Sequence, residues 1–429
     1  MNPKIILVVI LFSCLTLFFA FAPYSEDVPV VMPQDCVFNT VFGVVELDSS
    51  FLHAPAPKVQ QALDNGLSWL IKAQHPDGGW GAGFHSAQHV RDPHAVPPDP
   101  ATTAMVSMAL LRSGSSLSSG PYASSLEKST EFILTAIEQT PPDGSKITQL
   151  NGTQIQGKLG QNIDLVLSLQ YLNNLLEKMD QQHAQYERVY NVVAKGVDIV
   201  ETVMDTQGRT SGAGWAGVLQ SSFATNALEA AESNGIMVDT TKLKQSRAYQ
   251  RGNYDPVSKS VKTRDGAGVM LYSVSGSARA NAKGARKAKE IIAAKKKAGQ
   301  LEDDAEVSYK TLVQAGVDEK KALEYEAEYN VYESAKMKAQ EREVMSGFGN
   351  NGGEEFMSFL QTGESLIINK DESWKNWYDQ LSANLLNIQN QDGSWNGHHC
   401  ITSPVFCTAT CVLILSVNND IEELLARGQ

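Results

Sequence analysis

The sequence predicts an all-α protein in which about six helix pairs repeat along the chain, with an extended charged helical insertion after its middle. Three observations lead to this prediction. Apolar residues recur at three- and four-residue spacing, one turn motif occurs near both ends of the chain, and weaker copies of the same unit lie between them. Such units bury their apolar faces only against one another, so at least three are needed for a stable fold.

The first unit begins with a helix near Val59. Its apolar face is formed by Leu63, Leu67, Leu70 and Ile71. The helix stops at residues 75–79, where proline and glycine act as breakers, and Trp80 follows this turn. A proline-rich loop then leads to a second helix that begins near Thr102.

The same order returns at the far end of the chain, where a helix with apolar residues from Leu381 to Ile388 precedes a turn and a second helix. Both turns read Gln-x-x-Asp-Gly-x-Trp, and a Thr-Ala pair opens the following helix. The glutamine can satisfy free backbone groups at a helix end while the indole packs over it, which predicts a structural role. The motif residues are Gln74, Asp77, Trp80, Gln389, Asp392 and Trp395.

Between these copies, four weaker units are indicated at residues 126–176, 212–227, 266–282 and 347–360. The stretch 279–345 interrupts the series because it is rich in Ala, Lys and Glu and has few large apolar residues. It is expected to form exposed helices. Tyrosines at three- and four-residue spacing offer contact either with the repeats or with a protein partner.

Domain boundaries follow from these patterns. The apolar run 5–22 predicts a signal peptide or an N-terminal membrane anchor over residues 1–22, and therefore an exported protein, periplasmic or extracellular. Residues 23–57 are a proline-rich tether. The helix pairs are expected over 58–278 and 346–429, on either side of the charged insertion 279–345.

Charge and cysteine content narrow the class of protein further. The formal net charge of -12 argues against a nucleic-acid partner, because such proteins usually present a basic face. Of the five cysteines, Cys400 and Cys407 are close enough in sequence to bridge a short loop in an oxidising compartment.

The two Gln–Trp turns resemble the QW repeats of squalene and hopene cyclases, and related repeats occur in the β subunits of protein prenyltransferases. The resemblance extends in pattern over residues 59–417 and implies an α/α toroid of six helix pairs. The chain is similar to exported bacterial proteins with prenyltransferase/squalene oxidase repeats. A fold of this kind does not by itself fix an activity.

The motifs that carry chemistry in those families are missing. The cyclases protonate their substrate with an Asp-x-Asp-Asp-Thr motif, and the nearest adjacent pair, Asp303-Asp304, lies in the charged insertion without the flanking pattern. The prenyltransferases hold zinc with Asp, Cys and His, the Cys well upstream of the His. No cysteine lies between Cys36 and Cys400, so that arrangement is absent as well.

Two loop regions carry candidate functional residues. The loop after Trp80 is rich in imidazole and carboxylate groups, which bind metals and shuttle protons, although a solvated loop pinned by prolines accounts for them too. Its candidates for ligand binding are His85, His89, Arg91, Asp92, His94 and Asp99. Asp164, at the start of an apolar helix, is a further candidate for the cavity, or simply an acid favoured by the helix dipole.

The second region combines Glu354 and Glu355 with His398, His399 and Cys400. Consecutive repeats lie side by side in a toroid, so the glutamates are expected to face the histidines across its mouth. Together these groups offer a metal site with His398, His399 and Cys400 as ligands, a general acid/base pair, or a thiol nucleophile. The alternative for the glutamates is stabilisation of a helix N-terminus.

The preferred functional hypothesis is a ligand-binding module without triterpene cyclase activity, whose apolar or glycan ligand occupies the central cavity or the rim. An enzyme acting on an isoprenoid lipid or a polysaccharide is the alternative, and it requires a histidine and a carboxylate within hydrogen-bond reach. A scaffold that holds a partner through residues 279–345 is the third. The sequence names no cofactor.

Overall fold

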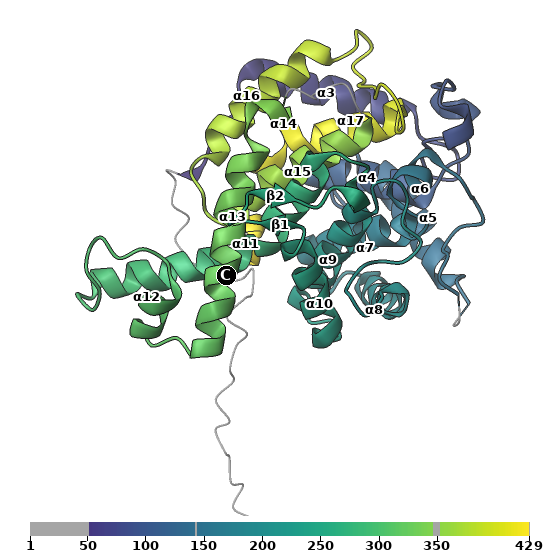
Figure 1. The fold of residues 1–429 in the computed structure, drawn as a ribbon. Helices are drawn as coiled ribbons and strands as arrows, with labels where there is room; N and C mark the ends of the chain where they lie inside the picture. Colours follow the sequence, from purple (N-terminus) through teal and green to yellow (C-terminus); the bar gives the residue numbers. More distant parts are fainter. Residues whose placement is uncertain (1–50, 142–143, 346–351, 429) are drawn as a thin grey trace, which may run out of the picture. The chain divides into compact units, whose positions relative to one another are not determined.

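Helices provide nearly all regular structure in the residues that the computed structural model describes, which are 51–141, 144–345 and 352–428 (Figure 1). The exception within these ranges is a short antiparallel hairpin of β1 (Tyr254–Asp255) and β2 (Ser260–Val261). The all-α class predicted from the sequence is confirmed. The segment 1–22 and most of the tether 23–57 lie outside the described residues, and their predicted roles remain predictions.

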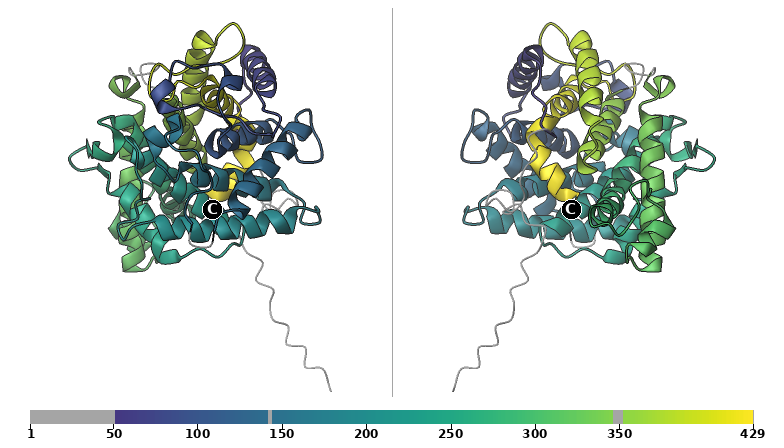
Figure 2. Two further views of the ribbon diagram at one scale, coloured as in Figure 1. Left: turned by 90° about the vertical axis from the view of Figure 1, so that its right-hand side faces the viewer. Right: turned by 90° about the vertical axis from the view of Figure 1, so that its left-hand side faces the viewer.

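Six helices form an inner ring in which each packs against the next, and the last packs against the first. They are α4 (Pro100–Arg112), α7 (Ile163–Lys178), α9 (Gly217–Ser233), α11 (Met270–Lys297), α15 (Gly353–Ile368) and α17 (Pro404–Leu415). Every residue of α4, α15 and α17 is buried, as expected for helices that are covered on all sides. Figure 2 shows the first and last units, purple and yellow, side by side where the ring closes.

Six outer helices each pack on the inner helix of the same pair. They are α3 (Pro57–Lys72), α5 (Ala123–Glu138), α8 (Tyr186–Val203), α10 (Thr240–Arg251), α13 (Glu319–Ala339) and α16 (Trp374–Ile388). The helix α3 is amphipathic: it buries Val59, Leu63, Leu67 and Leu70 while its other face meets solvent. Six helix pairs in a closed ring make the α/α toroid that the repeats predicted.

The described residues also contain four shorter α-helices: α6 (Gln154–Leu159), α12 (Tyr309–Gln314), α14 (Arg342–Met345) and α18 (Ile421–Arg427). Among the described residues, no single helix is long and apolar enough to span a membrane. Only α17 and the segment Val417–Arg427, bent by 60° against each other, meet that length and composition when taken together.

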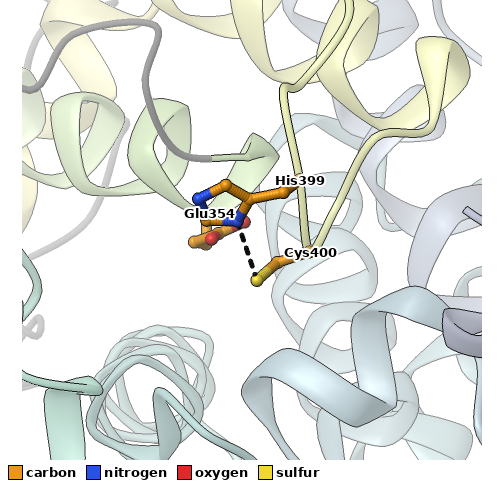
Figure 3. Close-up of side chains that lie close together, drawn as sticks. All are labelled: Glu354, His399 and Cys400. Carbon is orange, nitrogen blue, oxygen red and sulfur yellow. Dashed lines mark hydrogen bonds between the residues drawn. The ribbon is translucent and has the colours of Figure 1, made fainter.

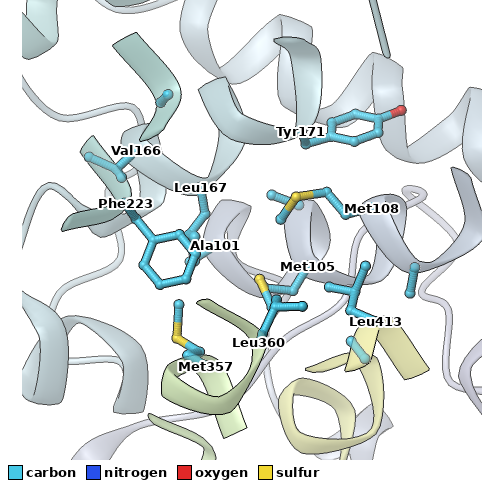
Figure 4. Close-up of a cluster of buried hydrophobic side chains, with 14 of the residues drawn as sticks. Ala101, Met105, Met108, Val166, Leu167, Tyr171, Phe223, Met357, Leu360 and Leu413 are labelled. Carbon is cyan, nitrogen blue, oxygen red and sulfur yellow. The ribbon is translucent and has the colours of Figure 1, made fainter. Parts of the chain in front are cut away.

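The interior of the ring is apolar. Five of the inner helices contribute side chains that gather there (Figure 4). They include Met105, Met108, Leu167, Phe223, Met357, Leu360 and Leu413. Acidic candidates from the sequence lie where inner helices begin: Asp99 caps α4, and Asp164 and Glu354 lie in the first turns of α7 and α15.

The Gln–Trp turns fasten the ring in the same way in both copies. Trp80 Nε1 donates to Leu70 O at 2.8 Å, and Trp395 Nε1 donates to Leu385 O at 2.9 Å. The backbone N–H of each tryptophan donates to the threonine that follows, Thr103 or Thr408, at 2.9 Å. Each indole is therefore fixed between the end of an outer helix and the start of its inner partner.

The glutamines join neighbouring units. Gln389 Nε2 donates to Gly393 O within its own turn and to Ala62 O of α3, at 2.9 and 3.0 Å. Gln74 makes the equivalent bonds to Gly78 O and to Ser125 O of α5. Gln389 thus ties the last unit to the first across the closure of the ring.

The charged stretch 279–345 is more closely joined to the ring than its composition suggested. The helix α11 runs without a break through position 279, so the expected boundary between 278 and 279 falls inside an inner helix. The helix α13 is the outer member of the fifth pair. Only the end of α11, α12 and the start of α13 extend beyond the pairs, around a small apolar cluster of their own (Ala288, Ile292, Leu312, Ala315 and Ala322). Alanines make much of this buried surface, which is why the stretch resembles an exposed helix in sequence.

The end of the ring formed by the inner helices' C-termini is closed by α18. Arg427 pairs with Glu177 of α7 at 2.7 Å, and Arg286 of α11 donates to Leu425 O at 2.6 Å. Arg112 of α4 also forms a buried ion pair at this end, with Glu364 of α15 at 2.8 Å. The opposite end, where the inner helices begin, carries the candidate site.

Candidate functional site

The loops that lead into the inner helices meet at one rim. Gln154 N donates to Gly83 O, Gly214 N donates to Leu159 O, and Gly353 N donates to Ile401 O. The first two bonds join the loops before α4, α7 and α9, and the third joins the start of α15 to the loop before α17. Cys400 N donates to Gln88 Oε1, which brings the two candidate loops predicted from the sequence together on the same rim.

Two glutamines connect the candidate loops directly. The side-chain oxygen of Gln88 accepts from Cys400 N at 3.1 Å, and its backbone oxygen accepts from the Thr402 hydroxyl at 2.7 Å. Gln154 Oε1 accepts from the backbone N–H groups of Thr402 and Ser403 at 2.7 and 3.1 Å. Sequence reasoning missed both glutamines, since glutamine in a polar loop carries no pattern of its own.

The second candidate region comes together at this rim as a compact cluster (Figure 3). One ligand atom each from Glu354, His399 and Cys400 lies within 4.8 Å of the other two. His399 Nδ1 is 3.1 Å from Cys400 Sγ. Glu354 is fully buried in the first turn of α15, whereas His399 is exposed on its loop.

Glycines allow these two loops to approach so closely. A side chain at Gly352 would meet His399 O at 2.2 Å, and one at Gly397 would meet Ile401 O at 2.0 Å, which real side-chain atoms do not tolerate. Cys400 itself has φ of 62°, a left-handed conformation that few non-glycine residues adopt. The loop thereby turns the Cys400 thiol towards Glu354.

Two further residues complete the cluster, and no sequence motif pointed to either of them. Lys158 Nζ lies 3.1 Å from Glu354 Oε1 and donates to Cys400 Sγ at 3.6 Å. The Tyr272 hydroxyl donates to the same Glu354 oxygen at 3.3 Å, and the Lys158 ammonium lies 5.5 Å from the centre of the Tyr272 ring. Both members of the ion pair are buried, so their attraction must offset a large loss of hydration.

Lys158 reaches the cluster because of α6, a helix of six residues. Thr153 and Gln156 form a capping box at its start. The Thr153 hydroxyl oxygen accepts from Gln156 N, and Gln156 Oε1 accepts from Thr153 N. Gly160, with φ of 139°, ends it. So short a helix has no readable apolar period, which explains why sequence reasoning left residues 154–159 unassigned.

The electrostatics of the cluster are set by burial and by Glu354. Burial raises the pKa of the Cys400 thiol, the negative charge of Glu354 raises it further, and Lys158 opposes both. Burial also raises the pKa of the Tyr272 hydroxyl, and the charges of Glu354 and Glu355 add to that effect. Glu354 Oε2 accepts no hydrogen bond from the described residues. A buried carboxylate oxygen in that position can accept from a bound group, since none of the described side chains or backbone N–H groups donates to it.

Asp99 and Asp164 lie on the rim, but both hold backbone N–H groups at the start of the inner helix α4. Asp99 accepts from Thr102 N and Ala82 N at 2.8 Å, and Asp164 accepts from Ala101 N at 3.1 Å and from Gln156 Nε2 at 2.8 Å. Burial raises the pKa of Asp99 to about 7, with the charge of Asp164 adding to the effect, and burial raises the pKa of Asp164 as well. Every carboxylate oxygen of the two is already engaged, so neither points into open space.

The other candidates of the first loop are not among the grouped ligand atoms of Glu354, His399 and Cys400. His85 contacts the Trp215 ring at 5.8 Å between centroids and lies 3.0 Å from Gln88 Nε2, while His89 is exposed. A separate groove of about 450 Å³ lies between the first and last turns. It is lined by Arg91, Asp92 and His94 together with Trp69, Lys72 and Asp392, among others.

Two expectations for the second region need adjustment. His398 is exposed and is not one of the grouped ligand atoms, so the third donor beside His399 and Cys400 is Glu354. Glu355 is buried next to Glu354 and acts on Tyr272 through its charge.

The expected disulfide is not formed. Cys400, Cys407 and Cys411 are free thiols in the structure. Cys407 Sγ faces Ile401 O at 3.6 Å at the start of α17, whereas the Cys400 thiol turns towards Lys158 and His399. The two thiols are close in sequence but have different partners.

Comparison with known proteins gives similarity only among solved structures, since no family model and no curated protein matches the chain. Variants of the type II terpene cyclase MstE from Scytonema in complex with the substrate geranylgeranyl dihydroxybenzoate match at 12% identity, with TM-scores of 0.42 and 0.41. The apo form of MstE matches at 11% identity with a TM-score of 0.31. Each alignment covers 85% of this chain and 98% of that one. The assignment of the fold therefore rests on the ring of helix pairs itself.

Proposed function

We propose that this chain is an exported α/α-toroid protein that binds its ligand at the rim through a divalent transition-metal ion held by Glu354, His399 and Cys400. The observation that carries the proposal is the grouping of a carboxylate, an imidazole and a thiol within 4.8 Å. Zinc accepts this mixture of oxygen, nitrogen and sulfur donors. Three protein ligands leave the fourth tetrahedral position for water or for a bound ligand.

Lys158 is compatible with such an ion. Its ammonium and the Tyr272 hydroxyl both contact Glu354 Oε1, which leaves Oε2 for the metal. Metal binding requires the Cys400 thiolate, and both the ion and Lys158 favour that form against the effect of burial. The lysine and the metal nevertheless repel each other, so the lysine is expected to moderate the affinity of the site.

The rim, rather than the ring interior, is the proposed place for the ligand. Apolar side chains gather at the centre of the ring (Figure 4), whereas His399 is exposed on the rim. Trp215, with 65% of its surface exposed, stands beside His85 on the same rim. An exposed indole of this kind is a suitable platform for the apolar part or the sugar face of a ligand.

We also propose that the chain lacks triterpene cyclase activity. Its sequence has no Asp-x-Asp-Asp-Thr motif. The two buried acids at the rim, Asp99 and Asp164, both hold backbone N–H groups at the start of α4.

The test is metal analysis of the purified full-length protein, followed by zinc titration of chelator-treated protein. We expect one zinc ion per chain in the wild type and at least a tenfold loss of affinity in His399→Ala and Cys400→Ser, since each removes a ligand. His398→Ala and Cys407→Ser are matched controls because they change a neighbouring imidazole and a neighbouring thiol outside the cluster. Wild-type protein that binds no zinc, or ligand variants that bind it as tightly as the controls do, would refute the proposal.

An enzyme that uses the same cluster is the second candidate. It requires a histidine and a carboxylate that can act together, and the ligand atoms of His399 and Glu354 lie within 4.8 Å of each other, a separation that one bridging water can span. A metal-bound water beside Tyr272 and Lys158 would suit hydrolysis of a polysaccharide or a lipid ester. Turnover of such a substrate by the zinc-loaded wild type, but not by Glu354→Gln, would favour the enzyme over the binding module.

A further inference from the structure

Lys158 and Cys400 form an unusual pair for a protein interior, an amine and a thiol in contact. Lys158 Nζ lies 3.6 Å from Cys400 Sγ, and the two residues are only 3% and 7% exposed. They come from α6 and from the loop before α17, far apart in sequence. Of the three described thiols, Cys407 and Cys411 are fully buried, and the Cys407 thiol donates to the backbone oxygen of Ile401.

We propose that Lys158 and Cys400 are a modification site, at which oxidation by hydrogen peroxide forms a covalent Nζ–O–Sγ bridge. In the first step the Cys400 thiol and one peroxide give a sulfenic acid and water. In the second, the sulfenic acid, the Lys158 amine and another peroxide give the bridge and two waters. Nitrogen and sulfur together lose four electrons, and the two peroxide molecules accept them.

The neighbouring side chains can move the protons that these steps release. Glu354 Oε1 lies 3.1 Å from Lys158 Nζ and can take a proton from the ammonium, which must become an amine before it reacts. His399 Nδ1 lies 3.1 Å from Cys400 Sγ and can take the thiol proton. His399 is exposed, so peroxide reaches the thiol from the solvent side of the loop.

The separation of the two atoms favours a bridge that contains oxygen. A direct bond between nitrogen and sulfur would require the whole loop before α17 to move towards α6. That loop is held by Gln154 through Thr402 and Ser403 and by Gln88 through Cys400 N. One inserted oxygen atom spans most of the distance and leaves these hydrogen bonds in place.

The bridge would also regulate the proposed metal site, because it consumes the sulfur ligand and the charge that pairs with Glu354. Formation of the bridge depends on the Lys158–Cys400 contact and not on metal binding. Its formation is therefore tested in chelator-treated protein, where a failure of the metal proposal has no effect.

The experiment treats full-length, chelator-treated protein with hydrogen peroxide, alkylates remaining thiols and maps the peptides by mass spectrometry. We expect one cross-linked pair of peptides that contains Lys158 and Cys400, heavier than their sum by one oxygen and lighter by two hydrogens. A thiol reductant is expected to release it. Loss of two hydrogens without added oxygen, or Cys400 oxidised to sulfinic acid with Lys158 unmodified, would overturn the proposal.

Variants sharpen this result. Lys158→Met and Cys400→Ser should abolish the cross-link, whereas Cys407→Ser and Lys146→Met, which alter a thiol and a lysine outside the cluster, should leave its yield unchanged. Circular dichroism establishes that each variant is folded. The wild-type peptide map remains decisive if Lys158→Met does not fold. Zinc added before peroxide is expected to slow the cross-link at least tenfold if the metal proposal also holds, and to leave it unchanged if only the metal proposal fails.

Discussion

Lys158 is the residue on which the chemistry of the rim depends most. It neutralises Glu354 at 3.1 Å in a place where neither side chain meets solvent. A buried ion pair contributes little net stability when intact, but removal of one partner leaves an uncompensated charge. The same ammonium lies among the atoms proposed as metal ligands. Stability and metal affinity should therefore respond to this residue in opposite directions.

Lys158→Met should destabilise the metal-free protein by about 3–5 kcal/mol, because it leaves the Glu354 carboxylate buried without its partner. The same variant should bind zinc at least tenfold more tightly, since the repulsion between ammonium and metal is gone. Urea unfolding with and without zinc measures both effects. Lys146→Met removes an exposed lysine and serves as the control. Equal zinc affinity in Lys158→Met and wild type would contradict the placement of the ion.

At the scale of the element, the Gln–Trp turns show why one motif occurs at both ends of the chain. Each turn joins the end of an outer helix to the start of its inner partner and to the next outer helix. In the last unit the next outer helix is α3, the first of the series. The motif at Gln389 therefore does for the closure of the ring what the motif at Gln74 does between the first two units.

Gln389→Ala should lower the free energy of unfolding by about 1–3 kcal/mol, since it leaves partly buried carbonyl groups without their donor. The neighbouring exposed residue provides the comparison: Gln391→Ala should change it by about 0.5 kcal/mol or less. Chemical denaturation of the two variants side by side is sufficient. A Gln389→Ala protein as stable as Gln391→Ala would show that the closure does not depend on this side chain.

Short elements limited what could be predicted at this scale. The long amphipathic helices were visible as periodic apolar residues, but α6 was not, because six residues do not complete a pattern. The inner part of α11 was assigned to a charged insertion because small residues such as Ala282 and Ala285 bury little apolar surface. Their fit against neighbouring helices is a property of the assembled ring.

At the scale of the whole folded unit, the rim carries buried acids that link stability to pH. The pKa of Asp99 is raised from 3.8 to about 7 by burial and by the charge of Asp164. Between pH 3.8 and about 7, the folded state therefore keeps a proton on Asp99 that the unfolded state has already released. Stability from this group is fully present below pH 3.8 and is lost as the pH rises through about 7.

The free energy of unfolding should accordingly fall as the pH is raised from 5 to 8, after allowance for other groups, and Asp99→Asn should flatten this dependence. The amide cannot accept every hydrogen bond that the carboxylate accepts, so the variant should also be less stable at pH 5. Urea unfolding at several pH values measures both effects. A wild-type protein that becomes more stable over this range, with the same slope in Asp99→Asn, would contradict the assignment.

The sequence by itself determined the class of fold, the number of helix pairs and the identity of three of the cluster residues. Repetition carries that information, because each unit must bury the same faces against its neighbours. It also indicated that Glu354 and the loop at His399 would meet, since consecutive units lie side by side. The sequence did not decide that His399 rather than His398 joins the cluster. Nor did it decide that Cys400 is a free thiol rather than disulfide-bonded to Cys407.

Only the tertiary structure decided which residues from distant units complete the site. Lys158 lies in α6, before α7, and Tyr272 lies in the first turn of α11, and ring closure brings them to Glu354 and Cys400. No local pattern records such a meeting, because a buried lysine differs from an exposed one only in what surrounds it. The Gln–Trp turns predicted that a ring would close, and the packing of six inner helices determined which side chains share its rim.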